Sequence, residues 1–294
     1  MKGRFNYDAV QSFIFERMLI EDLPNLVVEQ IAVPSHHLKR QVIVDFYLPK
    51  NITQPSELSL LLINDGQNLD EMPFSKMLDQ LFESNQVRPL LCVGIHAGKD
   101  RKNEYGTALQ ADFEGRGAKA QAYEQFILDQ LLPLVHVKYA IDQFRQAAFA
   151  GFSLGGLTAL DLTWRHPAIF STAGIFSGSL WWRSKSLGPD YNDDTDRIMH
   201  QQVRKGSFHP NLRFFFTTGS LDETADRNNN GIIDSIDDTL DLIRELEAYG
   251  YRQEQDIKYI NYEDGRHDIA TWARAMPQFL LWGWGGTPAG HQQP

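Results

Sequence analysis

Residues 147–162, AAFAGFSLGGLTALDL, decide the fold. The apolar run 147–150 is typical of a short buried strand, and residues 157–162 continue as a helix. Between them lies G-x-S-x-G, Gly151 to Gly155, centred on Ser153. A sharp strand-to-helix turn presents such a serine above the edge of a sheet, and it needs small residues two positions before and after. The stretch predicts a nucleophile at Ser153; the alternative is a simple glycine-rich turn.

Strand-like and helical segments alternate over most of the chain, which is typical of an α/β fold with a mainly parallel central sheet and helices on both faces. We expect strands at 41–48, 58–64, 90–96, 147–152, 171–177, 213–218 and 257–263. Helices are expected at 120–134, 155–166, 237–249 and 270–282. The segment 26–48 alternates polar and apolar residues and predicts an antiparallel lead-in to this sheet.

The chain is interpreted as one domain at 26–284, preceded by an N-terminal extension at 1–25 and followed by a disordered tail at 285–294. Within the domain, residues 180–210 are polar, rich in turns and non-periodic. A long irregular segment of this kind predicts an insertion that faces the substrate.

Composition excludes several classes of function. The net charge of the 294 residues is −10 and no Lys/Arg cluster interrupts it, so neither nucleic acid nor a membrane is an expected partner. The start of the chain lacks a basic segment followed by an apolar one, which predicts a cytoplasmic protein. Cys92 is the single cysteine and is expected to be buried filler.

A serine nucleophile needs a base, and the base needs an orienting acid. In the α/β-hydrolase fold these follow in the order serine, acid, histidine. His267 directly follows the last expected strand, where a loop can contribute to a site at the carboxyl edge of the sheet. The acid is expected after the strand 213–218, which predicts Asp222, with Glu223 as the fallback; both are otherwise solvated loop acids.

The tetrahedral intermediate of ester cleavage needs amide donors for its oxyanion. The residue after the nucleophile, Leu154, is expected to supply one. The loop that follows the buried strand 58–64 is expected to supply the second, at Gln67. An ordinary turn is the alternative for this loop.

These motifs together resemble the putative esterase family of α/β-hydrolases, which includes esterase D and the enterochelin (ferric siderophore) esterases. The resemblance rests on NDGQ (64–67), RKNEY (101–105), GRGA (115–118) with Tyr123 and Phe126, GFSLGG (151–156), SGSLWW (177–182) and GRHD (265–268) with Trp272 and Phe279. It implies an α/β-hydrolase fold and ester hydrolysis by Ser153, His267 and an acid at the Asp222 position. It also implies a substrate pocket lined by Arg101, Glu104, Tyr105 and Trp182.

A second pattern, DRNNNGIIDSID at 226–237, has the spacing of an EF-hand loop with aspartate at its last position. Calcium needs six to eight oxygen ligands, so the pattern predicts a structural calcium ion. The predicted ligands are Asp226, Asn228, Asn230, Ile232, Asp234 and Asp237. No helix is expected before Asp226, so the segment resembles a single dockerin-type loop; the alternative is an Asn/Asp/Gly turn that caps the next helix.

The predicted activity is that of a carboxylic ester hydrolase that acts on a small-molecule ester through an acyl-enzyme on Ser153. This reaction needs no organic cofactor. Acyl transfer is the enzymatic rival, because an alcohol can replace water at the same acyl-enzyme. A non-catalytic, calcium-dependent binding module on the same scaffold is the other rival. Substrate identity resides in the shape of the pocket, which sequence spacing does not encode.

Overall fold

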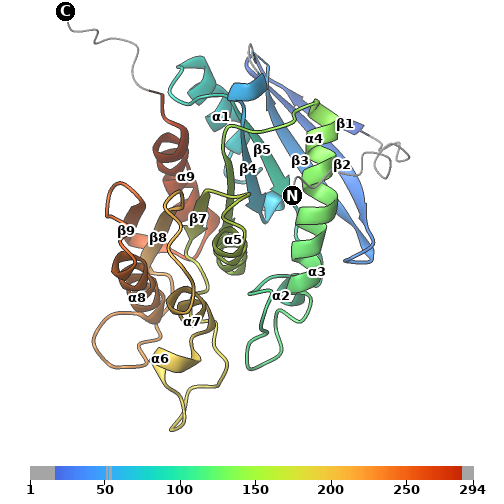
Figure 1. Cartoon of the computed structure of the whole chain (residues 1–294). Coiled ribbons are helices and arrows are strands. Elements are labelled where there is room, and N and C mark those ends of the chain that lie inside the picture. The colour runs from blue at the N-terminus through green and yellow to red at the C-terminus, as the bar shows by residue number, and fades with distance from the viewer. Residues whose placement is uncertain (1–16, 51, 53–54, 287–294) are drawn as a thin grey trace, which may run out of the picture.

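The computed structural model describes residues 17–50, 52 and 55–286, and the strands of this part form one nine-stranded sheet (Figure 1). Their order is β1-β2-β3-β5-β4-β6-β7-β8-β9. The strands are β1 (Arg17–Asp22), β2 (Leu26–Ser35), β3 (Arg40–Pro49), β4 (Ser59–Asn64), β5 (Leu90–Ile95), β6 (Ala147–Phe152), β7 (Thr172–Phe176), β8 (Arg213–Leu221) and β9 (Ile257–Arg266). The six strands β4 to β9 are parallel to one another. The strands β1, β2 and β3 are antiparallel to their neighbours, and β3 joins the parallel part by pairing with β5.

The central strands are apolar along their whole length because both faces of the sheet are covered. In β4, Leu60 and Leu62 pack into the core on one face, and Leu61 and Ile63 pack into the core on the other. Alternation of this kind follows from the period of two of a strand. Cys92 in β5 is fully buried and is a free thiol, as expected.

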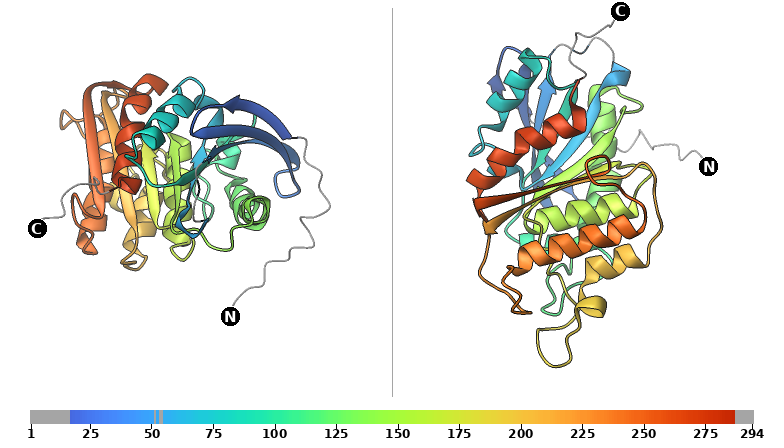
Figure 2. Two further views of the ribbon diagram at one scale, coloured as in Figure 1. Left: turned by 90° about the horizontal axis from the view of Figure 1, so that it is seen from above. Right: turned by 90° about the vertical axis from the view of Figure 1, so that its left-hand side faces the viewer.

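Helices cover both faces of the sheet, as the views from above and from the side show (Figure 2). One face packs against α1 (Phe74–Glu83) and α9 (Ile269–Trp284). The other packs against α3 (Ala120–Gln125), α4 (Leu132–Tyr139), α5 (Leu154–Arg165), α7 (Ile198–Arg204) and α8 (Asp234–Ala248). The short helical segments are η2 (Pro55–Glu57), η3 (Gly66–Asn68), α2 (Arg101–Glu104) and α6 (Asp193–Asp196). The predicted fold class is confirmed.

The predicted helix 120–134 is longer than expected and is not uniform. It consists of α3, the π-helical segment η4 (Phe126–Leu131) and α4, which continues to Tyr139. Pro133 lies in the first turn of α4, where its missing N–H removes no hydrogen bond of that helix. The proline therefore does not end the helix.

Two predicted boundaries differ from the structure. The N-terminal extension 1–25 contributes β1, which pairs with β2; its residues 1–16 lie outside the described residues, as do residues 287–294 of the predicted tail. The predicted insertion 180–210 contains α6 and α7, and α7 packs beside α8. None of the described helices combines the length and the apolar character that a bilayer span requires.

Candidate active site

Ser153 occupies the turn between β6 and α5 with φ 56° and ψ −121°, a backbone conformation that side-chain-bearing residues rarely adopt. The turn is possible because glycines stand on both sides of the serine, at positions 151 and 155, where a side chain would have no room. A Cβ atom on Gly151 would lie 2.4 Å from the Gly155 carbonyl carbon, and one on Gly155 would lie 2.7 Å from Asp65 Oδ2. The Asn64 amide also donates to the Gly155 carbonyl at 2.8 Å. These contacts hold the serine in its strained position.

Ser153 opens onto a cavity of about 350 Å³ at the carboxyl ends of the parallel strands. Its lining residues come from loops that are far apart in the sequence: Arg101, Lys102, Arg116, Ser153, Leu154, Ser177, Gly178, Ser179, Trp181, Asp222, Glu223, Ser235 and His267. The cavity therefore brings together the predicted nucleophile, the predicted base and both candidates for the acid.

His267 follows β9 and lies edge-on to the ring of Trp272, with 5.3 Å between the ring centroids. Removal of water from part of the imidazole lowers the pKa of His267, the negative charge of Asp222 opposes this shift, and the positive charge of Arg101 adds to it. No hydrogen bond between the described residues joins the imidazole to Ser153 or Asp222. Catalytic hydrogen bonds are often longer in ligand-free enzymes and tighten around the substrate.

The two neighbouring acids have different surroundings. Asp222 Oδ2 accepts the Gly219 N–H at 3.0 Å, and the Asp222 charge acts on His267. Glu223 instead faces the first turn of α8, where Ser235 lies beside it. The structure thus distinguishes their positions, with Asp222 next to the histidine.

The predicted oxyanion donors occupy different places. Leu154 lines the cavity as the first residue of α5, where the N–H groups of a helix have no partner within the helix. Gln67 is exposed in η3 and does not line the cavity; its side-chain oxygen accepts the Ala97 N–H at 3.0 Å. The assignment of the second donor to Gln67 stays a prediction.

Arg101 is the one predicted substrate-binding residue that lines the cavity. Its guanidinium group forms two hydrogen bonds with Asp65, at 2.6 and 2.8 Å, and a third with the Phe152 carbonyl at 3.2 Å. Burial lowers the pKa of Arg101, but the hydrogen bonds and charge of Asp65 outweigh this effect, so the pKa is raised. The pair with Asp65 ties α2 to the loop after β4, and the bond to Phe152 ties it to the strand that precedes the serine.

The other three predicted substrate-binding residues do not line the cavity, which corrects the prediction. Glu104 is buried in an ion pair with Arg40, and Tyr105 is buried with its hydroxyl accepting the Asp65 N–H at 3.1 Å. Trp182 is fully buried in the core. Each side chain has a structural partner that holds it away from the cavity, so these residues support the loops around the site.

Sequence reasoning missed several residues of the cavity wall. Trp181 lines the cavity in place of its neighbour, and the Arg116 guanidinium lies over its ring, 4.8 Å from the centroid. Ser179 Oγ lies 3.3 Å from Ser153 Oγ, and Ser177 Oγ accepts the Trp272 indole N–H at 3.1 Å. The signal lay in the segment 177–182, from which the family resemblance implied Trp182 and not its neighbour as the lining residue.

The predicted calcium loop is closed by hydrogen bonds among its own residues. The Asp226 carboxylate accepts the N–H groups of Asn230 and Gly231 at 3.1 and 2.9 Å. The side-chain amides of Asn228 and Asn230 both donate to Asp237 Oδ2, at 3.0 and 2.7 Å. These three side chains therefore meet at one point of the loop.

The two remaining predicted ligands have different partners. Asp234 pairs with the Arg227 guanidinium group, which also contacts Asp238, whereas the Ile232 N–H donates to Asn230 Oδ1 at 2.8 Å. No three His, Cys, Asp or Glu side chains are grouped to hold a metal ion in the described part of the chain. The oxygen set of the loop depends on asparagine and backbone groups as much as on carboxylates, and calcium binding stays a prediction.

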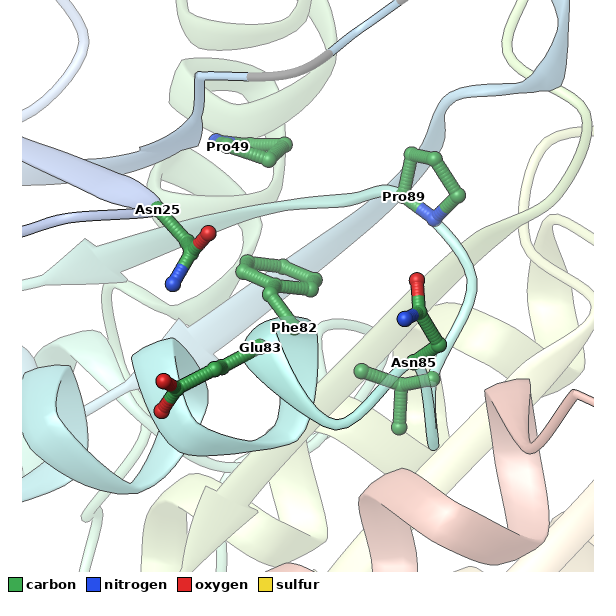
Figure 3. A pocket seen from close by; sticks show the side chains of 7 residues that line it. Asn25, Pro49, Phe82, Glu83, Asn85 and Pro89 are labelled. Carbon is green, nitrogen blue, oxygen red and sulfur yellow. The ribbon is translucent and has the colours of Figure 1, made fainter.

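Two other hollows contain neither Ser153 nor His267. One, of about 280 Å³, lies beside the end of α1, and Glu83 is the one ionisable residue in its lining (Figure 3). Another, of about 510 Å³, lies at the amino ends of β4 and β6, at the opposite edge of the sheet from Ser153. The cavity at Ser153 is therefore the candidate active site.

Curated relatives match most of this chain but only part of their own length. The iron(III) enterobactin esterase of Escherichia coli K12 is 24% identical over 264 residues, which cover 88% of this chain and 57% of the relative. The iron(III) salmochelin esterase of Escherichia coli O6:H1 is 25% identical over 185 residues, which cover 61% of this chain and 42% of the relative. The chain spans about half the length of these two relatives.

Solved structures share the fold. A siderophore hydrolase from Aspergillus nidulans superposes with a TM-score of 0.67 at 16% identity, covering 93% of this chain and 100% of that chain. An enterobactin esterase from Shigella flexneri has a TM-score of 0.67 at 21% identity, covering 90% and 59%. A family model described as "Putative esterase" matches residues 35–282. The chain therefore belongs to the putative esterase family.

Proposed function

We propose that this protein hydrolyses small-molecule carboxylic esters through an acyl-enzyme on Ser153, with His267 as the base and Asp222 as the acid that orients it. The observation that carries the proposal is the strained turn at Ser153, which opens onto a cavity that also holds His267 and Asp222. Family membership supports ester hydrolysis as the reaction class.

In the proposed reaction, His267 takes the proton of the Ser153 hydroxyl as Ser153 Oγ attacks the ester carbonyl carbon. The Leu154 N–H stabilises the negative charge on the carbonyl oxygen. When the intermediate collapses, the C–O bond to the alcohol breaks and His267 returns the proton to the leaving alkoxide. Water then releases the acyl group by the same steps, which yields a carboxylic acid and regenerates Ser153.

The lowered pKa of His267 suits this role, because a base must be unprotonated at the working pH. The negative charge of Asp222 becomes favourable once the imidazole has accepted the serine proton. The acid is therefore most useful when positive charge develops on the imidazole.

We extend the proposal to siderophore-type esters as the substrate class. The relatives named above as enterobactin and salmochelin esterases support this extension, as does a cavity wall that carries Arg101, Lys102, Arg116 and Trp181. Lys102 has no ion-pair partner among the described residues, and Trp181 supplies an aromatic ring to the cavity wall, against which an aromatic group of a ligand can pack. An anionic, aromatic ester fits such a wall.

The test of the nucleophile is treatment with a fluorophosphonate followed by intact-mass measurement and peptide mapping. We expect one label, on Ser153, and its loss in Ser153→Ala and His267→Ala, whereas Ser84→Ala on α1 labels like the wild type. A folded protein that takes no label, or takes it at another residue, contradicts the proposal.

The test of the substrate class is incubation with ferric enterobactin and with p-nitrophenyl acetate, with and without an added acceptor alcohol. We expect water to be the acyl acceptor, so that free acids accumulate in both reactions. Formation of the acceptor's ester as the main product would assign acyl transfer instead. Turnover of p-nitrophenyl acetate without turnover of ferric enterobactin would restrict the proposal to simpler esters.

A further inference from the structure

We propose that Glu223 and Ser235 form a hydrogen-bonding subsite of the cavity that selects esters carrying a hydroxyl group close to the scissile bond. The inference rests on the proposed ester hydrolysis at Ser153 and deepens it, because it assigns a specificity-determining role to two residues outside the proposed triad.

The first argument is the position of the two residues. Glu223 lies in the loop after β8, Ser235 lies in the first turn of α8, and both line the cavity that contains Ser153. Glu223 directly follows the proposed triad acid in the chain. The charge of Asp222 acts on His267, whereas the Glu223 side chain lies beside the first turn of α8.

The second argument is that both residues have polar atoms without partners. Glu223 Oε1 and Ser235 Oγ are buried from solvent and lie side by side, and neither forms a well-directed hydrogen bond with the described residues, although Ser235 is close enough to stabilise the Glu223 carboxylate. Polar atoms removed from water cost free energy unless they are paired, and a ligand that pairs them recovers this cost. A site with such atoms rejects an analogue that lacks the matching group.

The third argument is the charge around Glu223. Burial raises the pKa of Glu223 and the negative charges of Asp234 and Asp238 add to it, while the adjacent Ser235 opposes the shift. The Glu223 carboxylate accepts hydrogen bonds, and the Ser235 hydroxyl can donate one. A hydroxyl group of the substrate can therefore donate to Glu223 and accept from Ser235.

The test compares ester pairs that differ only in hydroxyl groups. The probes are methyl 4-hydroxycinnamate and methyl cinnamate, ethyl 2,3-dihydroxybenzoate and ethyl benzoate, and methyl 3-hydroxybutanoate and methyl butanoate. We expect the wild type to prefer the hydroxylated member of at least one pair by about tenfold in kcat/KM, chiefly through KM, as one hydrogen bond would give.

Three variants connect this preference to the subsite. Glu223→Leu and Ser235→Ala are expected to lose it, through a higher KM for the hydroxylated ester at similar kcat. Glu223→Gln keeps the shape and an oxygen acceptor, so it is expected to retain the preference. Glu83→Leu, the same type of change in the hollow beside α1, is the matched control and retains it as well.

The outcomes separate this inference from the proposed function. Absence of any preference in the wild type, or a preference that survives Glu223→Leu and Ser235→Ala, overturns the subsite if Ser153 is labelled by fluorophosphonate and p-nitrophenyl acetate is hydrolysed. Absence of labelling and of hydrolysis in the same preparation overturns the proposed function itself. Retention in Glu223→Gln with loss in Glu223→Leu supports the subsite.

Discussion

At the scale of single residues, the proposed site depends on backbone positions that have no room for larger side chains. Gly155 is the clearest case, because its neighbours are the buried Asp65 carboxylate and the Asn64 side chain and not the flexible end of a surface residue. A change here acts on the serine through the backbone, without touching any group that takes part in the chemistry.

The first prediction is therefore that Gly155→Ala reduces fluorophosphonate labelling of Ser153 and lowers the free energy of unfolding by about 1–3 kcal/mol, since overpacking forces the turn to shift. Gly188→Ala is the matched control, because a Cβ atom at Gly188 meets nothing within 4 Å. Thermal unfolding and labelling rate measure the two effects. Wild-type labelling in Gly155→Ala would show that the tight turn is not needed.

The second prediction concerns the acid. Asp222→Asn is expected to reduce kcat by about 10³- to 10⁴-fold, the size of effect found when the acid of such a triad is neutralised. The negative charge of Asp222 opposes the lowering of the His267 pKa, so its removal lowers that pKa further. Because the protonated histidine is inactive as a base, the acidic limb of the pH profile of kcat/KM moves to lower pH in the variant.

Asp264→Asn is the matched control for this measurement, since Asp264 is exposed and pairs with Arg274. Full activity of Asp222→Asn together with loss of activity in Glu223→Gln would transfer the role of the acid to Glu223. The same result would remove the argument that Glu223 belongs to a separate subsite.

At the scale of elements, the loop 226–237 connects the proposed acid to α8. Its own hydrogen bonds bring the amides of Asn228 and Asn230 to the Asp237 carboxylate. Rotation of both amides by half a turn exchanges their nitrogen and oxygen atoms, which places oxygens at the same point. An oxygen set of this kind suits calcium.

The third prediction is that millimolar calcium raises the melting temperature of the protein and that EDTA reverses the change. A ligand that binds only the folded state stabilises it by about 2.7 kcal/mol at 100 times its dissociation constant. Asp237→Asn is expected to abolish the calcium effect, whereas Asp256→Asn, an acid in the turn before β9, retains it. An unchanged melting temperature in the wild type would leave the loop as a self-capped turn.

The elements themselves show what sequence patterns can predict. The central strands were predicted within a few residues because they are buried on both faces and are bounded by turns. The helix α1 was missed, since its amphipathic pattern is short and directly follows Pro73. Trp182 was predicted to line the cavity and Trp181 does so instead, because which side chain faces the cavity depends on the path of the loop and not on local periodicity.

At the scale of the whole molecule, acid stability depends on buried groups that are neutral in the fold. His200 is fully buried, its Nε2 lies 2.8 Å from the Asp238 carbonyl, and its Nδ1 has no partner among the described residues. Burial lowers the pKa of His200 well below its ordinary value, and the nearby Arg197 adds to this effect. The unfolded chain therefore binds a proton at this histidine before the folded one does.

The fourth prediction follows from this difference. Because the unfolded state takes up more protons below about pH 6.5, stability is lost as the pH falls from there, at about 1 kcal/mol per pH unit for one such histidine. His200→Gln is expected to have a shallower decrease of the melting temperature between pH 7.5 and 5.5 than the wild type. His209→Gln, at a partly exposed histidine, is the control with the wild-type slope.

The residues that line the cavity come from a long stretch of the chain, from Arg101 to His267. On the ribosome, synthesis reaches Ser153 long before β9 and α9 exist, and the loop that carries His267 follows β9. A nascent or prematurely terminated chain thus displays a serine without its base. Under the proposed mechanism, such fragments are inert toward cellular esters, and activity begins only after β9 and the loop that carries His267 have been synthesised.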